Sequence, residues 1–284
     1  MSYYKILGLK KEPFSTSPDP FFFYPSREHR QCLSKLQISI QLKRGLSVVF
    51  GDVGTGKTTV ARCLMQIIKE DKKNNLFGIL NPHYSTEHEF LQHLARLFHI
   101  KAADTLSNQR CIEAIEKFLF REIVVEKKTV ILLIDEAQKL TKPALEALRI
   151  LLNFETNENK MLQLILLGQM ELLPIISCIH NLWDRVSLKC VLNPLNTQET
   201  AELIDFRVRT ASYTNAHPLI TKDSAKAIYN YSRGYPRKTV EVCHKALEYL
   251  VMYQKKIVDT DVIHEITLEE SDLLKYVLNE SENG

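Results

Sequence analysis

The chain has 284 residues, of which 45% are hydrophobic and 25% are charged, and its formal net charge is +3. This length suits one medium-sized domain and a smaller one, and the weak positive charge does not by itself indicate a nucleic-acid partner, although it permits an anionic one. The six cysteines are scattered without a C-x-x-C pair, which favours reduced thiols over a disulfide framework. The start of the chain lacks a signal-peptide core and no apolar run reaches membrane-spanning length, so we expect a soluble, cytoplasmic protein.

Residues 1–27 form a segment rich in proline and aromatic residues. Three prolines fall within residues 18–25, and because proline fixes its own backbone and restricts the residue before it, this stretch cannot be helical. Many aromatic side chains would be poorly suited to a free linker, so we expect the segment to pack on the core domain. Packing alone would explain the composition, and lining a binding pocket is the alternative.

A helix is predicted over residues 27–42, followed by a buried strand over residues 46–50. Residues 51–58 then read Gly-Asp-Val-Gly-Thr-Gly-Lys-Thr, which fits the phosphate-binding pattern G-x-x-x-x-G-K-[ST]. The glycines let backbone N–H groups converge on phosphate oxygens at a helix start; Lys57 would reach the β- and γ-phosphates, and the Thr58 hydroxyl would hold Mg²⁺. An ordinary glycine-rich turn does not need Gly-Lys-Thr, so we predict a nucleotide site made of Gly51, Asp52, Val53, Gly54, Thr55, Gly56, Lys57, Thr58 and Thr59.

The second strand is expected at residues 76–80, with helices through residues 90–98 and 112–119 and a loop at 101–108. The apolar run 129–134 then ends in Asp135 and Glu136, as expected of a buried parallel strand with a site at its carboxyl end. Asp135 would support the Mg²⁺ held by Thr58, and Glu136 would orient and polarise the attacking water. An acidic helix N-cap is the alternative for this pair, and the phosphate-binding loop upstream weighs against it.

A helix beginning near Thr141 and Pro143 precedes a strand at residues 161–167 and Gln169, a candidate sensor of the γ-phosphate whose alternative role is a polar helix cap. The spacing leaves room for an extra strand between the two motif strands. A fifth strand, residues 186–192, follows Arg185. The pattern predicts an α/β fold, with a parallel sheet flanked by helices and a smaller all-helical domain.

Beyond Pro194 the apolar spacing is helical throughout, with the last short helix near residues 262–266. We therefore expect four parts in the chain. They are the N-terminal segment 1–27, an α/β nucleotide-binding domain 28–194, a helical lid domain 195–277, and a frayed tail 278–284.

Taken together, the order of these motifs resembles the AAA+ ATPases, and more narrowly their ExeA/GspA type. The segments that carry the resemblance are Pro13-Phe14 with Pro18-Asp19-Pro20 and Tyr24, the phosphate-binding loop (Walker A), Ile134-Asp135-Glu136-Ala137-Gln138 (Walker B), Leu148-Arg149 with Asn153–Thr156, Gly168-Gln169-Met170-Glu171, and Gly234-Tyr235-Pro236-Arg237. Each is weak alone, but their order and spacing are specific. Met170 stands where the family usually has proline.

The resemblance implies roles that spacing could not show. It implies Mg²⁺-dependent hydrolysis of ATP to ADP and phosphate, with adenine preferred over guanine. Arg237 would act as the sensor 2 arginine of the lid, and Arg185 as an arginine finger that acts on a neighbouring subunit. Arg149 is the rival finger, and a structural salt bridge is the alternative for either residue. Subunits would assemble into a ring or a filament.

The purpose of hydrolysis stays open between two classes. An ExeA-type motor would organise a secretion complex with a membrane-protein partner. A TnsC/MuB-like transposition regulator would assemble on duplex DNA and hand it to a transposase, with steeply salt-dependent binding. A non-catalytic nucleotide switch is disfavoured by Glu136. Full-length secretion ATPases of this type continue into a membrane span and a cell-wall-binding domain, so we expect either a fragment or a stand-alone relative.

Overall fold

The computed structural model describes residues 2–17, 19–101, 103–156, 159–214 and 217–268. Its internal contacts divide the chain into two compact units. One, the α/β unit, contains Arg27–Val53 and Lys57–Asn193; the other, the helical unit, contains Met1–Ser26, Gly54–Gly56 and the chain from Pro194 onward. The predicted tail 278–284 and the end of the predicted lid, residues 269–277, lie outside the described residues.

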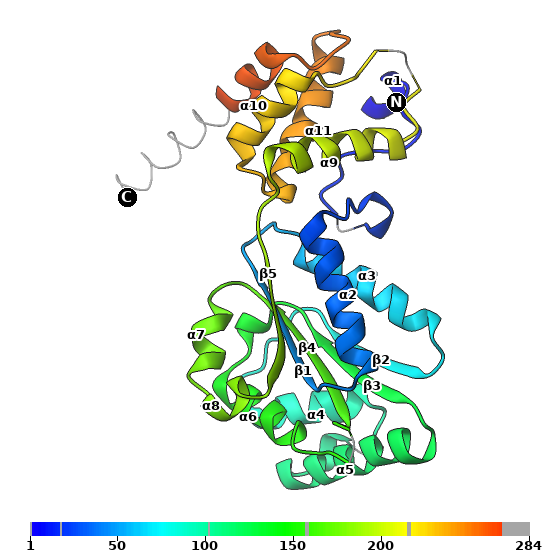
Figure 1. Cartoon of the computed structure of the whole chain (residues 1–284), viewed down its shortest axis with the longest axis vertical. Coiled ribbons are helices and arrows are strands. Elements are labelled where there is room, and N and C mark those ends of the chain that lie inside the picture. Colours follow the sequence, from blue (N-terminus) through cyan, green and yellow to red (C-terminus); the bar gives the residue numbers. More distant parts are fainter. Residues whose placement is uncertain (1, 18, 102, 157–158, 215–216, 269–284) are drawn as a thin grey trace. The chain divides into compact units, whose positions relative to one another are not determined.

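A five-stranded parallel sheet forms the centre of the α/β unit (Figure 1). Its spatial order is β2-β3-β4-β1-β5, so β4 lies between β1 and β3 and the predicted extra strand between the two motif strands is confirmed. The strands are β1 (Leu46–Gly51), β2 (Asn74–Ile79), β3 (Thr129–Ile134), β4 (Leu162–Gly168) and β5 (Val186–Leu192).

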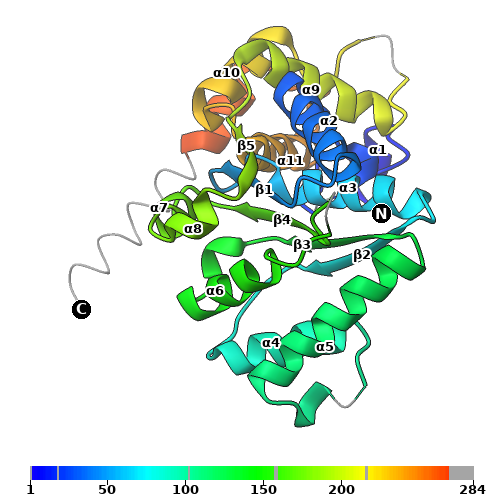
Figure 2. The same cartoon turned by 60° about the horizontal axis from the view of Figure 1, so that its bottom comes forward.

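Helices cover both faces of this sheet, as Figure 2 shows. On one face lie α2 (Arg27–Gln41) and α3 (Lys57–Glu70); on the other lie α4 (Glu87–Leu97), α5 (Asn108–Phe120) and α6 (Lys142–Leu151). Strands buried on both faces need apolar residues at nearly every position, which explains the continuous apolar runs of β1, β3 and β4. The α/β architecture is therefore confirmed.

Shorter elements connect these layers. A π-helical turn, η3 (Arg121–Val125), extends α5, and 3-10 turns η2 (Ala103–Thr105) and η4 (Ala137–Lys139) lie in the loops before α5 and after β3. Two short helices, α7 (Leu172–Ser177) and α8 (His180–Trp183), join β4 to β5. Strand β2 begins two residues before its predicted start, because Asn74 and Asn75 pair with β3 through the backbone without contributing apolar side chains.

The helical unit contains α9 (Thr197–Thr210), α10 (Lys222–Ser232) and α11 (Pro236–Met252), and residues 260–268 are also helical. A capping box starts α9 where the sequence predicts a break. The side chain of Asn196 accepts the Glu199 N–H at 2.9 Å, and the Glu199 carboxylate accepts the Asn196 N–H at 3.2 Å. Pro236 occupies the first turn of α11, where its missing N–H costs nothing.

The N-terminal segment, with α1 (Tyr3–Ile6) and η1 (Pro20–Phe22), packs differently from the prediction. Its Leu9, Phe14 and Phe22 belong to the apolar cluster of the helical unit, not to the nucleotide-binding core. The guanidinium of Arg207 in α9 fixes the segment by donating to the carbonyl oxygens of Pro13 at 3.1 Å and Ser15 at 3.2 Å. Burial lowers the pKa of Arg207 to about 10. The cluster that the segment joins is decided by tertiary packing, which local sequence patterns do not reveal.

The start of the helical unit also depends on a glycine, which gives a test. Gly234 has φ +75°, its carbonyl accepts the Leu195 N–H at 2.8 Å, and an added Cβ would collide with the Leu195 carbonyl oxygen and lie 2.9 Å from its carbon. We expect Gly234→Ala to lower the free energy of unfolding by roughly 2–4 kcal/mol, because both the backbone conformation and the close approach are lost. Urea unfolding followed by circular dichroism measures this.

Gly78→Ala is the matched control for this substitution. A Cβ at Gly78 would meet only the flexible end of Met65, at 3.2 Å, and the position has no positive φ. We expect its urea midpoint to stay close to that of the unsubstituted chain. A Gly234→Ala protein as stable as the Gly78→Ala control would contradict the requirement for glycine at position 234.

Candidate functional site

The candidate site lies where three neighbouring strands end. Parallel strands bring their carboxyl ends to one edge of a sheet, and ligands of open α/β sheets bind outside that edge. Here β1 leads into the phosphate-binding loop, β3 ends at Asp135 and Glu136, and β4 ends at Gln169. Sequence-distant residues predicted to share a site are thus brought to the same edge.

The phosphate-binding loop is ordered around its lysine. Lys57, the first residue of α3, is 5% exposed, and its ammonium donates to the carbonyl oxygens of Gly51 at 2.8 Å and Asp52 at 2.9 Å. Burial lowers the pKa of Lys57, while the nearby carboxylates of Glu136 and Asp135 oppose that shift. Gly54 and Gly56 have φ angles of +82° and +98°, so the loop uses backbone conformations that favour glycine.

A hydrogen bond joins the start of α3 to the end of β3. The Thr58 Oγ1 donates to Asp135 Oδ2 at 2.7 Å, and Asp135 Oδ1 accepts the Glu136 N–H at 2.9 Å. Burial raises the pKa of Asp135, and the hydrogen bonds from Thr58 and Glu136 limit that rise. A hydroxyl beside a carboxylate is a pair of hard oxygen donors of the kind that Mg²⁺ prefers, so these two residues fit the predicted metal site.

Glu136 has a constrained backbone and a partly open side chain. Its φ is +55° and its ψ +36°, a left-handed conformation that costs a residue other than glycine about 1–3 kcal/mol and is common in active sites. Its side chain is 29% exposed. Carboxylate Oε2 accepts from Gln138 Nε2 at 2.7 Å and lies 3.9 Å from the Lys139 ammonium. The position suits a carboxylate that must meet solvent water.

Gln169 follows β4 directly, as predicted, and it is linked to Glu136 through Gln138, a residue for which the sequence predicts no role. The backbone N–H of Gln169 donates to Gln138 Oε1 at 3.1 Å. Gln138 stands in the Walker B segment that carries the family resemblance, but neither periodicity nor spacing indicates that its side chain spans two strand ends. That contact depends on the three-dimensional position of β4.

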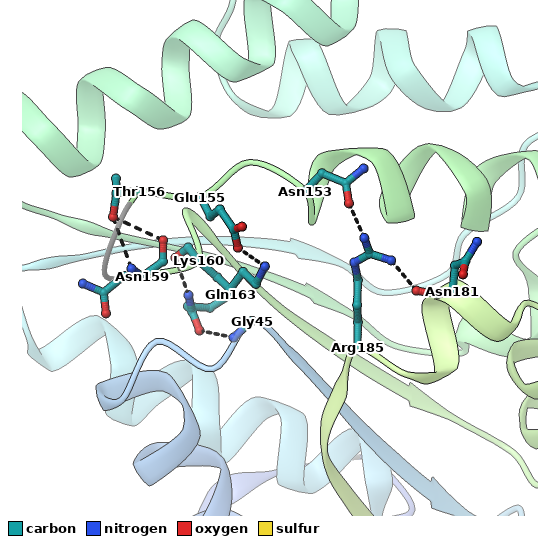
Figure 3. Close-up of polar contacts among 9 residues, drawn as sticks. All are labelled: Gly45, Asn153, Glu155, Thr156, Asn159, Lys160, Gln163, Asn181 and Arg185. Atoms are coloured by element: carbon teal, nitrogen blue, oxygen red, sulfur yellow. Dashed lines mark hydrogen bonds and ion pairs between the residues drawn. The ribbon is translucent and has the colours of Figure 1, made fainter.

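Two of the three candidate arginines lie away from the phosphate-binding loop. The third, Arg237, contacts it, because the Arg237 backbone N–H donates to the Gly54 carbonyl oxygen at 3.2 Å. Arg185 directly precedes β5, so it lies at the amino ends of the parallel strands, whereas Glu136 lies at their carboxyl ends. The Arg185 guanidinium donates to the carbonyl oxygen of Asn181 and to Asn153 Oδ1 (Figure 3). Arg149 in α6 donates through Nε to Glu146 at 2.6 Å. Arg237 is the exposed second residue of α11 in the helical unit. The roles of all three as finger or sensor stay predictions.

Comparison with known proteins agrees with this arrangement. Residues 40–176 match the family model described as an AAA domain. This part of the chain is an AAA domain. Over 247 residues the chain is 33% identical to general secretion pathway protein A of Aeromonas hydrophila, a match that covers 86% of this chain and 44% of that protein. The predicted resemblance to the ExeA/GspA type is confirmed, and the chain spans less than half the length of this relative.

Solved structures similar to the chain have the same kind of fold. Cdc6p from Pyrobaculum aerophilum has a TM-score of 0.64 at 17% identity, covering 87% of this chain and 67% of that chain. The Drosophila ORC structure bound to DNA has a TM-score of 0.63 at 17% identity, covering 93% and 65%. At these identities the similarity shows the fold alone. The AAA domain and the match to the secretion protein support the predicted ATPase activity.

Proposed function

We propose that the AAA domain binds ATP with Mg²⁺ and hydrolyses it to ADP and phosphate. The observation that carries the proposal is the hydrogen bond between Thr58 and Asp135, with Glu136 next in the chain at the same strand ends. Residues 51–59 would bind the nucleotide phosphates. Thr58 and Asp135 would hold Mg²⁺, which when bound neutralises charge on the phosphate oxygens.

Each residue of the chain has a distinct part in this reaction. Lys57 would exchange its present partners, the carbonyl oxygens of the loop, for phosphate oxygens. Glu136 would orient the attacking water and polarise it, which its partly exposed carboxylate permits. Gln169 would contact the γ-phosphate beside Glu136. Because phosphoryl transfer depends mainly on positioning and electrostatics, the constrained turn at Glu136 is part of the mechanism.

Hydrolysis in this proposal requires more than one copy of the chain. Arg185 lies at the amino ends of the strands and Glu136 at their carboxyl ends, so Arg185 is available to the site of a neighbouring copy rather than to its own. We propose Arg185 as the arginine finger of a ring or filament, with Arg149 as its rival. Arg149 is the weaker candidate because its guanidinium is paired with a carboxylate, that of Glu146, whereas Arg185 donates to the neutral oxygens of Asn181 and Asn153. Arg237 would report the nucleotide state to the helical unit.

The match to general secretion pathway protein A supports a role in assembling a secretion complex. The proposed partner is a membrane protein, and the proposed location is the cytoplasm. Among the described helices, none combines the length and apolar character of a membrane span.

A second candidate function is ATP-dependent binding of duplex DNA, as in transposition regulators of the TnsC/MuB kind. Two structural neighbours were solved bound to DNA, and the net charge of +3 is compatible with an anionic partner. We rank this candidate second because the similarity to a secretion protein, at 33% identity, supports the first.

Replacement of the proposed water-orienting carboxylate tests the reaction. We expect Glu136→Gln to bind ATP with unchanged affinity and to hydrolyse it about 100-fold or more slowly, because the amide is nearly isosteric but is a poor base. Nucleotide titration and steady-state phosphate release measure the two properties. Unchanged turnover would remove Glu136 from the mechanism.

Duplex DNA distinguishes the two biological roles. If the chain is a secretion motor, ATP turnover should ignore DNA at low and at moderate salt. Stimulation by DNA that moderate salt cancels would favour the transposition regulator, since contacts to phosphates release counterions and weaken steeply with salt. The measurement is steady-state hydrolysis with and without duplex DNA at both salt concentrations.

A further inference from the structure

The side chain of Gln138 uses both ends of its carboxamide to join two parts of the site. Its Nε2 donates to Glu136 Oε2 at 2.7 Å, and its Oε1 accepts the backbone N–H of Gln169 at 3.1 Å. One side chain therefore connects the carboxylate after β3 to the first residue after β4. A glutamine can do this because its amide has a donor and an acceptor at fixed separation.

The surroundings leave room for this link. An added Cβ at Gly168, the last residue of β4, would lie 3.2 Å from Gln138 Oε1 and 2.5 Å from Leu172 Cδ2. The glycine thus lets the carboxamide and the first turn of α7 approach the strand end closely. Gln138 is half-buried in η4, two residues after Glu136, so its backbone is held near the carboxylate it binds.

Among the described residues, the Gln138 amide makes the shortest polar contact with the Glu136 carboxylate. The Glu136 backbone is fixed by its left-handed conformation and by the hydrogen bond of its N–H to Asp135. The Lys139 ammonium, 3.9 Å from the carboxylate, makes a shorter contact of 2.8 Å with Asn81 Oδ1. The 2.7 Å hydrogen bond from Gln138 is the closer interaction.

We propose that Gln138 is a positioning residue that orients the Glu136 carboxylate and couples it to the end of β4. A displacement at Gln169, where the γ-phosphate is proposed to be sensed, would pass through the Gln138 carboxamide to Glu136. This inference rests on the proposed role of Glu136 in hydrolysis. It assigns Gln138 no contact with nucleotide, so its loss affects the rate of the chemical step and spares binding.

Gln138→Met tests the link, because methionine keeps the length of the side chain and removes both the donor and the acceptor. We expect kcat to fall roughly 10- to 100-fold, the size typical of lost supporting hydrogen bonds around a catalytic group, while KM and the dissociation constant for ATP stay unchanged. Gln138→His, which retains one donor and one acceptor, should recover part of the lost kcat.

Gln163→Met is the matched control. The Gln163 carboxamide also joins two parts of the α/β unit, donating to the Lys160 carbonyl oxygen and accepting the Gly45 N–H, both at 2.9 Å, but at the opposite end of β4 (Figure 3). We expect Gln163→Met to lower the Tm and to leave kcat unchanged. A fall in kcat specific to Gln138→Met then reflects positioning rather than a general loss of packing.

The Glu136→Gln background separates failure of this inference from failure of the proposed function. If Glu136→Gln turns over normally, the proposed function is wrong. If Glu136→Gln stalls while Gln138→Met turns over at the normal rate or faster, only the role of Gln138 is overturned. The role is also overturned if Gln138→Met weakens ATP binding, or if single-turnover rates show that it slows the Glu136→Gln protein as much as the unsubstituted one, because a positioning residue acts through Glu136.

Discussion

The hydrogen bond between Thr58 Oγ1 and Asp135 Oδ2 is the contact on which the site depends. It joins the first turn of α3 to the end of β3, two elements that are far apart in the chain. The strand that leads into α3, β1, is not a neighbour of β3 in the sheet, because β4 lies between them. The parallel sheet makes the contact possible by bringing its strand ends to one edge. Lys57, Glu136 and Gln169 then take their places from the same three strands.

This arrangement places charged groups where burial is costly. Lys57 and Asp135 are 5% and 1% exposed, and an isolated charge at such positions would be strongly destabilising. Each is supplied with hydrogen bonds instead: loop carbonyl oxygens for the ammonium, and the Thr58 hydroxyl and the Glu136 N–H for the carboxylate. The left-handed backbone at Glu136 adds strain at the same point. The buried charges of Lys57 and Asp135 and the backbone of Glu136 therefore destabilise the fold at the candidate site, where the proposed function requires a fixed geometry.

Local sequence patterns predicted the parts whose physics is local. The apolar runs of β1, β3 and β4 identify buried parallel strands, and the glycines before Lys57 predict a sharply turning loop before α3. The capping pair Asn196 and Glu199 explains why α9 begins where the sequence predicts a break. These features depend on neighbours within a few residues, so the chain itself displays them.

Long-range packing determined the rest. The N-terminal segment was expected on the nucleotide-binding core, but Phe14 and Phe22 join the cluster of the helical unit and Arg207 holds the segment there. The proposed positioning role of Gln138 rests on the hydrogen bond of its carboxamide to the Gln169 N–H, 31 residues away in the chain. Arg185 likewise contacts Asn153, which lies 32 residues before it in the chain. No spacing in the sequence encodes these contacts.

The affinity for ATP in the presence of Mg²⁺ and of a chelator, measured by calorimetry for the unsubstituted chain and for Asp135→Asn, tests the central claim most directly. If Thr58 and Asp135 hold Mg²⁺ with the nucleotide, Mg²⁺ should strengthen ATP binding by the unsubstituted chain, and most of that gain should disappear in Asp135→Asn. An equal gain in both proteins, or no gain in either, would contradict the assignment of the site.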